Sequence, residues 1–317
     1  MLCPPIFDLH CDTLTAFMDQ TSTPGADTLN NPTHHFSFGK IPKGTRWAQC
    51  CAIFLPDRLH GAEAADFYAH HRDSFYRQMT TLEPLVSPCR SSEDIQRAWN
   101  CGKAAALLTV ENASALAGDL SRVEQLRRDG VVMMTLTWNG ANELGSGHST
   151  GDGLTPFGKA AVREMEAQGI LVDVSHLNDR GFFDLLDTTK KPFAASHSNA
   201  RAVCAHRRNL TDDQIREMME RKCLIGLNYY NAFLRSDGQE ATGEDLWRHV
   251  EHFLALGAQD CLALGSDFDG AQVPAFLDCP EKVAGLEAFF LQKGLSPALA
   301  EKILWCNALD FFKLNLA

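Results

Sequence analysis

Short apolar runs alternate with longer amphipathic stretches along all 317 residues of the chain. Such alternation is the pattern of a parallel sheet whose strands are joined by helices. Several runs contain few polar residues, as expected of strands buried on both faces. Eight strands in this length predict one α/β domain, residues 1–317, folded as a (β/α)8 TIM-like barrel with its active site at the C-terminal ends of the strands. The apolar runs are Ile6–Leu9, Trp47–Leu55, Ala104–Val110, Val131–Leu136, Ile170–Val174, Phe193–Ala195, Leu224–Leu227 and Cys261–Leu264.

The stretches between these runs carry helix signals. The longest is GAEAADFYAHHRDSFYRQMTTL, residues 61–82. A later one opens on Thr211 as a predicted N-cap, and the next ends on Gly257 as a predicted C-cap. Two further helices are expected at about 281–293 and 296–313. We expect the aromatic side chains of the last helix to pack against the barrel, because aromatic stripes at helical spacing are usually core.

The composition restricts the partners and the compartment. A net charge of −11 argues against nucleic acid or an anionic membrane surface as a main partner. The N-terminus lacks the pattern of a signal peptide, and no stretch reaches the about 18 apolar residues of a membrane span. The 11 cysteines form no C-x-x-C pair, which fits reduced thiols. We therefore expect a cytoplasmic protein without a membrane partner.

Polar side chains follow five of the predicted strands at the point where each strand ends. In the first, IFDLHCDTL, His10 and Asp12 are two residues apart and lie on one face, while Cys11 faces the core. A single histidine after a strand is usually a loop residue, and an aspartate before glycine is usually a turn residue. The repetition of the same position on separate strands indicates a metal site instead. The residues concerned are His10, Asp12, Glu111, His176, His197, Asp267 and Asp269.

The types of donor in this set indicate the metal and the chemistry. Imidazole and carboxylate without thiolate favour Zn²⁺, Mn²⁺, Co²⁺ or Fe²⁺ over Ca²⁺ or Mg²⁺. The set exceeds what one tetrahedral Zn²⁺ can take, and it suits two ions about 3.5–4 Å apart, bridged by a carboxylate and by water or hydroxide. Glu111, from a separate strand, is placed to bridge them. Such a centre predicts hydrolysis of an amide-type bond, with Asp267 transferring a proton to the leaving amine.

A basic segment, SHSNARAVCAHRRNL, occupies residues 196–210 and contains Arg201, Arg207 and Arg208. Such a run is ordinarily a solvated loop. Beside a metal-ligating histidine it can also bind the anionic end of a substrate, since guanidinium pairs bidentately with carboxylate. Composition alone leaves both readings open.

The chain resembles the membrane (renal) dipeptidase family of zinc peptidases, within the metal-dependent amidohydrolase barrels. The resemblance covers nearly the whole chain through the ordered motifs DLHCDTL, TVENAS, LVDVSH, SHSNARAVCAHRRNL, GLNYYNAF and GSDFDG. It implies a homodimer that cleaves dipeptides and tolerates a D-residue at the C-terminal position. It also implies a proton-handling role for Asp267, a grip on the substrate carboxylate by Arg208, and a pocket-lining role for Tyr230. The implied zinc ligands are His10 and Asp12 for one ion, His176 and His197 for the other, and Glu111 between them.

One position departs from the family pattern. After the fourth predicted strand, animal members carry LTH, whose histidine contacts the substrate and helps stabilise the oxyanion. This chain has LTWN, which places Trp138 in that position. Either Asn139, Asn142 or His148 supplies the missing donor, or Trp138 reshapes the pocket and the substrate range shifts.

Two other functions compete with the dipeptidase interpretation. Lactonases, phosphotriesterase-like enzymes and deaminases are also two-metal barrels, but they usually begin with His-x-His and often bridge their metals with a carboxylated lysine. This chain has His-x-Asp and Glu111 at those places. A catalytically inactive barrel kept for binding is the second alternative, and only the substitution at Trp138 favours it.

Overall fold

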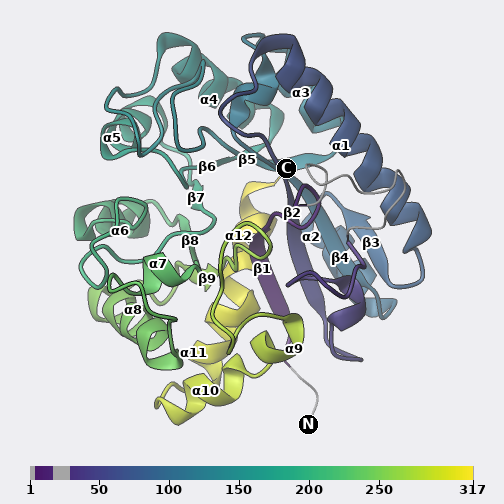
Figure 1. Ribbon diagram of the computed structural model, residues 1–317, viewed down its shortest axis with the longest axis vertical. Coiled ribbons are helices and arrows are strands. Elements are labelled where there is room, and N and C mark those ends of the chain that lie inside the picture. Colours follow the sequence, from purple (N-terminus) through teal and green to yellow (C-terminus); the bar gives the residue numbers. More distant parts are fainter. Residues whose placement is uncertain (1–3, 17–28, 317) are drawn as a thin grey trace.

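The computed structural model describes residues 4–16 and 29–316. Eight parallel strands close into a barrel in the order β1, β2, β4, β5, β6, β7, β8, β9, and helices surround them (Figure 1). This confirms the predicted (β/α)8 barrel. The barrel strands are β1 (Ile6–Cys11), β2 (Trp47–Phe54), β4 (Ala104–Glu111), β5 (Val131–Thr135), β6 (Leu171–Asp173), β7 (Ala194–Ala195), β8 (Leu224–Leu227) and β9 (Leu262–Leu264).

A ninth strand, β3 (Val86–Cys89), was not predicted from the sequence. It pairs with the first half of β4, while β5 pairs with the second half. β3 has four residues and contains Pro88, which removes a backbone donor and is tolerated only at a sheet edge. It therefore lacks the apolar run by which the other strands were recognised.

The helices begin and end close to their predicted limits. Thr211 forms a capping box with Gln214 at the start of one helix, and Gly257 ends another in the left-handed conformation, with φ of 92°. The predicted helix at 281–293 is instead two short helices, and the predicted helix at 296–313 contains a π-helical turn, η3 (Lys302–Cys306). The α-helices are α1 (Gly61–Thr81), α2 (Ser92–Asn100), α3 (Ser121–Arg128), α4 (Pro156–Gln168), α5 (Asp179–Thr188), α6 (Asp212–Glu220), α7 (Asn231–Leu234), α8 (Gly243–Leu256), α9 (Pro280–Val283), α10 (Leu286–Gln292), α11 (Pro297–Glu301) and α12 (Asn307–Asn315).

The last helix packs against the barrel, as the sequence predicted. Phe311 and Phe312 of α12 are buried in one cluster with barrel residues, and the Phe312 ring lies 4.9 Å from that of Phe7 on β1. A second, larger cluster fills the space between the strands and the helices. Apolar packing thus supports the barrel from below and around, and leaves the C-terminal ends of the strands to polar residues.

The described residues bear on two further expectations, that the cysteines are reduced and that no segment spans a membrane. The cysteines of the described residues are all unpaired, and Cys11 is buried in the core. Within the same residues, none of the helices combines the length and apolar character that crossing a membrane requires.

Candidate metal centre

A β-bulge in β1 turns the first two predicted ligands into the mouth of the barrel. The register with β2 slips between Asp8 and Cys11, where β1 has one residue more than its partner. Phe7, before the slip, packs with the α12 aromatics, and Leu9 lies in the same cluster. His10 lies within the slip and Asp12 just beyond it. His10 Nε2 is 3.4 Å from Asp12 Oδ2, so the two side chains share one face as predicted.

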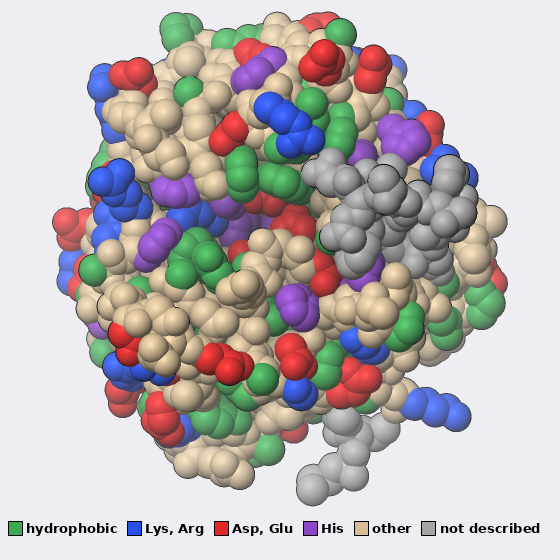
Figure 2. Space-filling view, in the orientation of Figure 1, with side chains coloured by type: hydrophobic (Ala, Val, Ile, Leu, Met, Phe, Trp, Pro, Cys, Tyr) green, Lys and Arg blue, Asp and Glu red, His purple; other side chains and the backbone are tan. Residues whose placement is uncertain are grey.

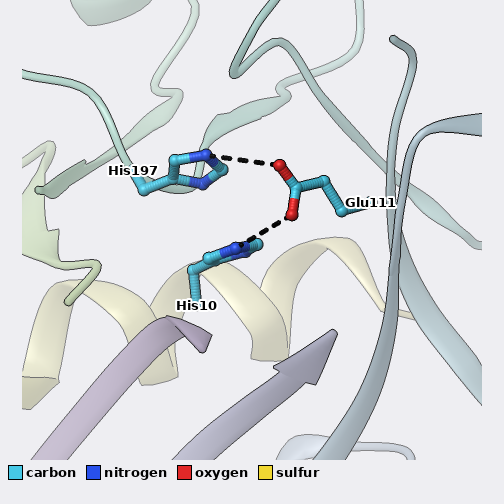
Figure 3. A group of neighbouring side chains, drawn as sticks. All are labelled: His10, Glu111 and His197. Carbon is cyan, nitrogen blue, oxygen red and sulfur yellow. Dashed lines mark ion pairs between the residues drawn. The ribbon is translucent and has the colours of Figure 1, made fainter. Parts of the chain in front are cut away.

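Glu111, at the end of β4, lies between two groups of side chains. Its Oε2 is 3.3 Å from His10 Nε2, and its Oε1 is 2.7 Å from His176 Nε2 and 3.9 Å from His197 Nε2. Figure 3 shows the carboxylate between His10 on one side and His197 on the other. Asp267 Oδ1 approaches His10 Nε2 at 3.9 Å, and all these side chains are buried. The donor atoms of two triplets lie close enough to hold an ion, namely His10 with Glu111 and His197, and His10 with Asp12 and Asp267.

The two remaining histidines present lone pairs to Glu111. The Nδ1–H of His176 donates to Asn139 Oδ1 at 2.9 Å, and the Nδ1–H of His197 donates to Ser196 Oγ at 2.8 Å. Burial lowers the pKa of His176 and of His197 well below the ordinary value, so both rings are neutral. Their Nε2 atoms are 3.0 Å apart. Acceptor atoms that face one another and a carboxyl group at this distance are stabilised by a proton or a metal cation between them, so the arrangement fits a metal site.

The carboxylate side of the site fits a cation equally well. Burial, reinforced by Asp12, raises the pKa of Glu111 to about 8. Burial alone would lower the pKa of His10, but the neighbouring Asp12 and Glu111 carboxylates raise it well above the ordinary value. Asp12 Oδ1 is buried without a hydrogen-bond partner among the described residues. A metal ion satisfies such a set of carboxylates without requiring protons on them.

The backbone at the strand ends is strained where it presents these side chains. His176 has φ of 74° and Asp267 φ of 61°, in the left-handed region that non-glycine residues rarely adopt. Gly270 lies so close that a Cβ on it would be 1.9 Å from Asp12 Oδ2 and 2.8 Å from Asp267 Oδ1. The glycine that ends GSDFDG is therefore needed for space, and the motif is more than a turn.

A cavity of about 760 Å³ opens above the centre. Figure 2 shows histidine, acidic and basic side chains gathered in this hollow. Arg208 is the one Lys or Arg that lines it within the described ranges, and this side chain is only 4% exposed. The Nε and Nη2 atoms of Arg208 have no hydrogen-bond partner among those residues. Burial lowers the pKa of Arg208 to about 10, so the guanidinium is still charged at neutral pH. Tyr230 lines the same cavity.

The structure separates the candidates for the donor missing at Trp138. Asn139 accepts from His176, so it orients a predicted ligand. Asn142 donates to Asn112 Oδ1 and the Leu136 carbonyl, and it does not line the cavity. His148 does line the cavity, with its Nδ1 buried and unpartnered among the described residues. Trp138 also lines it, in contact with Phe54, which the sequence analysis did not single out.

Sequence reasoning also missed the residues that hold the ligands in place. Asp173 Oδ2 accepts a 2.6 Å bond from Ser196 Oγ, and thereby fixes the hydroxyl that orients His197. Asn228 Nδ2 donates to Asp267 Oδ2 at 2.9 Å. These residues lie within the motifs LVDVSH, SHSNARAVCAHRRNL and GLNYYNAF. A polar residue on a buried strand close to a predicted ligand is the sequence signal that could have identified them.

A family model described as membrane dipeptidase, peptidase family M19, matches residues 3–314. The chain belongs to the membrane dipeptidase family. Its resemblance to that family, predicted from the motifs, is thereby confirmed, and so is its place among the metallodipeptidases.

Individual proteins resemble this chain in sequence or in fold. The dipeptidase tcpJ of Claviceps purpurea is 30% identical over 267 residues, which are 80% of this chain and 60% of that protein. The crystal structure of a metallopeptidase named dipeptidase AC matches with a TM-score of 0.92 and 25% identity over 99% of both chains. A metallopeptidase of Rhodobacter sphaeroides, bound to a phosphinate mimic of L-Ala-D-Ala, shares the fold at a TM-score of 0.92 and 24% identity, also over 99% of both.

Proposed function

We propose that this M19 member is a binuclear zinc dipeptidase that hydrolyses the peptide bond of dipeptides, including those with a C-terminal D-residue. The position of Glu111 is the observation that carries the proposal. Its two carboxylate oxygens face separate groups, His10 on one side and the His176 and His197 pair on the other. A bridging carboxylate between two ions needs this arrangement.

The residues present fit two ions. His10 and Asp12 would hold one, His176 and His197 the other, and Glu111 both. Zn²⁺ is favoured by these donors, with Mn²⁺, Co²⁺ or Fe²⁺ as alternatives. Bound there, the ions would supply an activated water and polarise the scissile carbonyl.

The chain's own residues do the remaining work. Asp267 Oδ1 faces the centre while Asn228 holds Oδ2, so Asp267 is placed to take a proton and pass it to the leaving amine. Arg208 pairs with the C-terminal carboxylate of the dipeptide through its unpartnered nitrogens. His148, which lines the same cavity, donates to the substrate, and Tyr230 lines the pocket.

A related two-metal hydrolase is the second candidate. Lactonases and phosphoesterases use the same type of centre, and no contact that the described residues make in the cavity selects a peptide by itself. The buried, unpartnered guanidinium of Arg208 favours a substrate that carries a free carboxylate, which phosphotriesters and simple lactones lack.

The test is amino-acid release from a panel of L-X-L-Y and L-X-D-Y dipeptides. Zinc-loaded protein is compared with chelated and re-metallated samples. D-residues are included because the Rhodobacter sphaeroides relative binds a mimic of L-Ala-D-Ala. We expect cleavage of both series that is lost on chelation and restored by zinc. Binding of two ions without cleavage of any dipeptide would contradict the proposal and redirect the assay to lactones and phosphoesters.

Two further properties belong to the proposal. We propose that the enzyme is a homodimer, the commonest assembly of oligomeric enzymes, and that it works in the cytoplasm. Sedimentation equilibrium of the zinc-loaded protein tests the first, and a monomer at micromolar concentration would contradict it. Cell fractionation tests the second.

A further inference from the structure

We propose that Phe54 and Trp138 form the subsite for the side chain of the substrate's N-terminal residue, and that the enzyme prefers dipeptides in which this residue is large and apolar. The inference rests on the proposed dipeptidase function and adds a substrate class to it.

The two aromatic rings form one wall of the cavity. Phe54 ends β2 and Trp138 follows β5, and their rings meet edge to face, with centroids 4.9 Å apart at an angle of 64°. Both side chains line the cavity and are only half-buried, unlike the aromatic residues of the core. Aromatic surface left partly exposed in a concave site is typical of a ligand-binding wall.

This wall directly adjoins the predicted metal centre. The Trp138 ring centroid is 6.3 Å from that of His176, and the next residue, Asn139, bonds to the His176 ring. If the scissile peptide bond lies over Glu111 and His176, the side chain of the residue next to that bond can therefore reach the Trp138 ring.

The charged end of the cavity lies on the other side of the centre. Arg208 follows β7, and its guanidinium stacks 5.4 Å above the Phe233 ring, which follows β8. In the barrel order, β2, β4 and β5 are adjacent on one side, and β7 and β8 are adjacent on the other. The cavity therefore has an aromatic end at Phe54 and Trp138, and a cationic end at Arg208.

A dipeptide can span this cavity in one productive direction. With its carboxylate on Arg208 and its peptide bond over the centre, the N-terminal residue points toward Phe54 and Trp138. No Lys or Arg of the described residues lines that wall, so an acidic side chain has no cationic partner there. An acidic N-terminal side chain would lose hydration against the rings without an ion pair in return, whereas a large apolar one would bury its surface against them.

The test compares kcat/KM for Phe-Ala and Leu-Ala with kcat/KM for Gly-Ala and Glu-Ala. For the unaltered, zinc-loaded enzyme we expect the ratio of Phe-Ala to Gly-Ala to be about 10 to 100, the range that one well-seated apolar side chain gives. Trp138→Ala is expected to reduce this ratio about tenfold or more, whereas Trp138→Phe keeps it within about threefold, because the aromatic wall is preserved. Phe183→Ala, at an exposed aromatic on α5, is the matched control and leaves the ratio unchanged.

The ratio separates this proposal from the proposed function. A ratio near one in the unaltered enzyme, or equal loss on both substrates in Trp138→Ala, would overturn the subsite while leaving the dipeptidase intact. Cleavage of no dipeptide at all would instead overturn the proposed function. Zinc content and thermal unfolding are measured for each variant. If Trp138→Ala does not fold, Phe54→Ala and Trp138→Phe decide the question, with a lowered ratio expected for the first only.

Discussion

Removal of the Ser196 hydroxyl should weaken zinc binding without touching a metal ligand. Ser196 Oγ donates to Asp173 Oδ2 at 2.6 Å and accepts from His197 Nδ1 at 2.8 Å, and all three residues are fully buried. In Ser196→Ala, His197 Nδ1–H loses its acceptor, and a buried donor without a partner costs about 1–3 kcal/mol. The imidazole also loses the contact that fixes its tautomer and orientation, and loss of such a contact typically lowers metal affinity about 10- to 100-fold.

The two effects are measured separately. Urea unfolding of the metal-free protein reports the loss of stability, and competition with a chromophoric chelator reports zinc affinity. Ser114→Ala is the matched control, because Ser114 Oγ is buried but has no hydrogen-bond partner among the described residues, so its removal should leave zinc affinity unchanged and should not lower the stability. The reasoning is refuted if Ser196→Ala matches the control in both assays.

Four other substitutions test separate parts of the account. Asp12→Ala is expected to lose bound metal and nearly all turnover, and two ions with full turnover in this variant would sink the assignment. Gly270→Ala places a methyl group against the Asp12 carboxylate, so metal analysis should show fewer than two ions while the far-UV circular dichroism is unchanged. Arg208→Ala should raise KM by roughly 10- to 100-fold with a smaller change in kcat, because it removes a proposed charged hydrogen bond that the substrate makes equally in the ground state and the transition state. Arg207→Ala, at the exposed neighbouring residue, is the control and should leave KM unchanged. Burial lowers the pKa of His249 from its ordinary value of about 6.5 to about 4, so the buried neutral imidazole contributes fully to stability above pH 6.5 and less as the pH falls toward 4. Between pH 7.5 and 5, the unfolding free energy of the metal-free protein should therefore fall by about 2 kcal/mol more than that of His249→Gln. Equal pH slopes for the two proteins would contradict this.

The sequence predicted the barrel and the gathering of polar residues at one mouth because both depend on patterns within single strands. Apolar runs mark the strands, and parallel strands bring their C-terminal ends together, so Glu111 and His197 are neighbours in space although far apart in sequence. β3 was not predicted because its four residues, which include Pro88, carry no such apolar run.

What could not be predicted depends on the pairing between strands. The bulge that turns His10 into the mouth exists only in the register of β1 against β2. The bond from Ser196 to Asp173 likewise follows from the register of β7 against β6, which aligns Asp173 with Ala194. The sequence left three donors open beside Trp138, and only side-chain contacts showed that Asn139 and Asn142 are already engaged.

The most direct test of the binuclear centre is dipeptide hydrolysis measured while zinc is returned stepwise to the chelated protein. The account predicts that activity rises with added zinc and reaches its plateau at two equivalents per chain, because the proposed centre would be complete only when Glu111 holds both ions. A plateau at one equivalent, or activity that survives complete chelation, would contradict it.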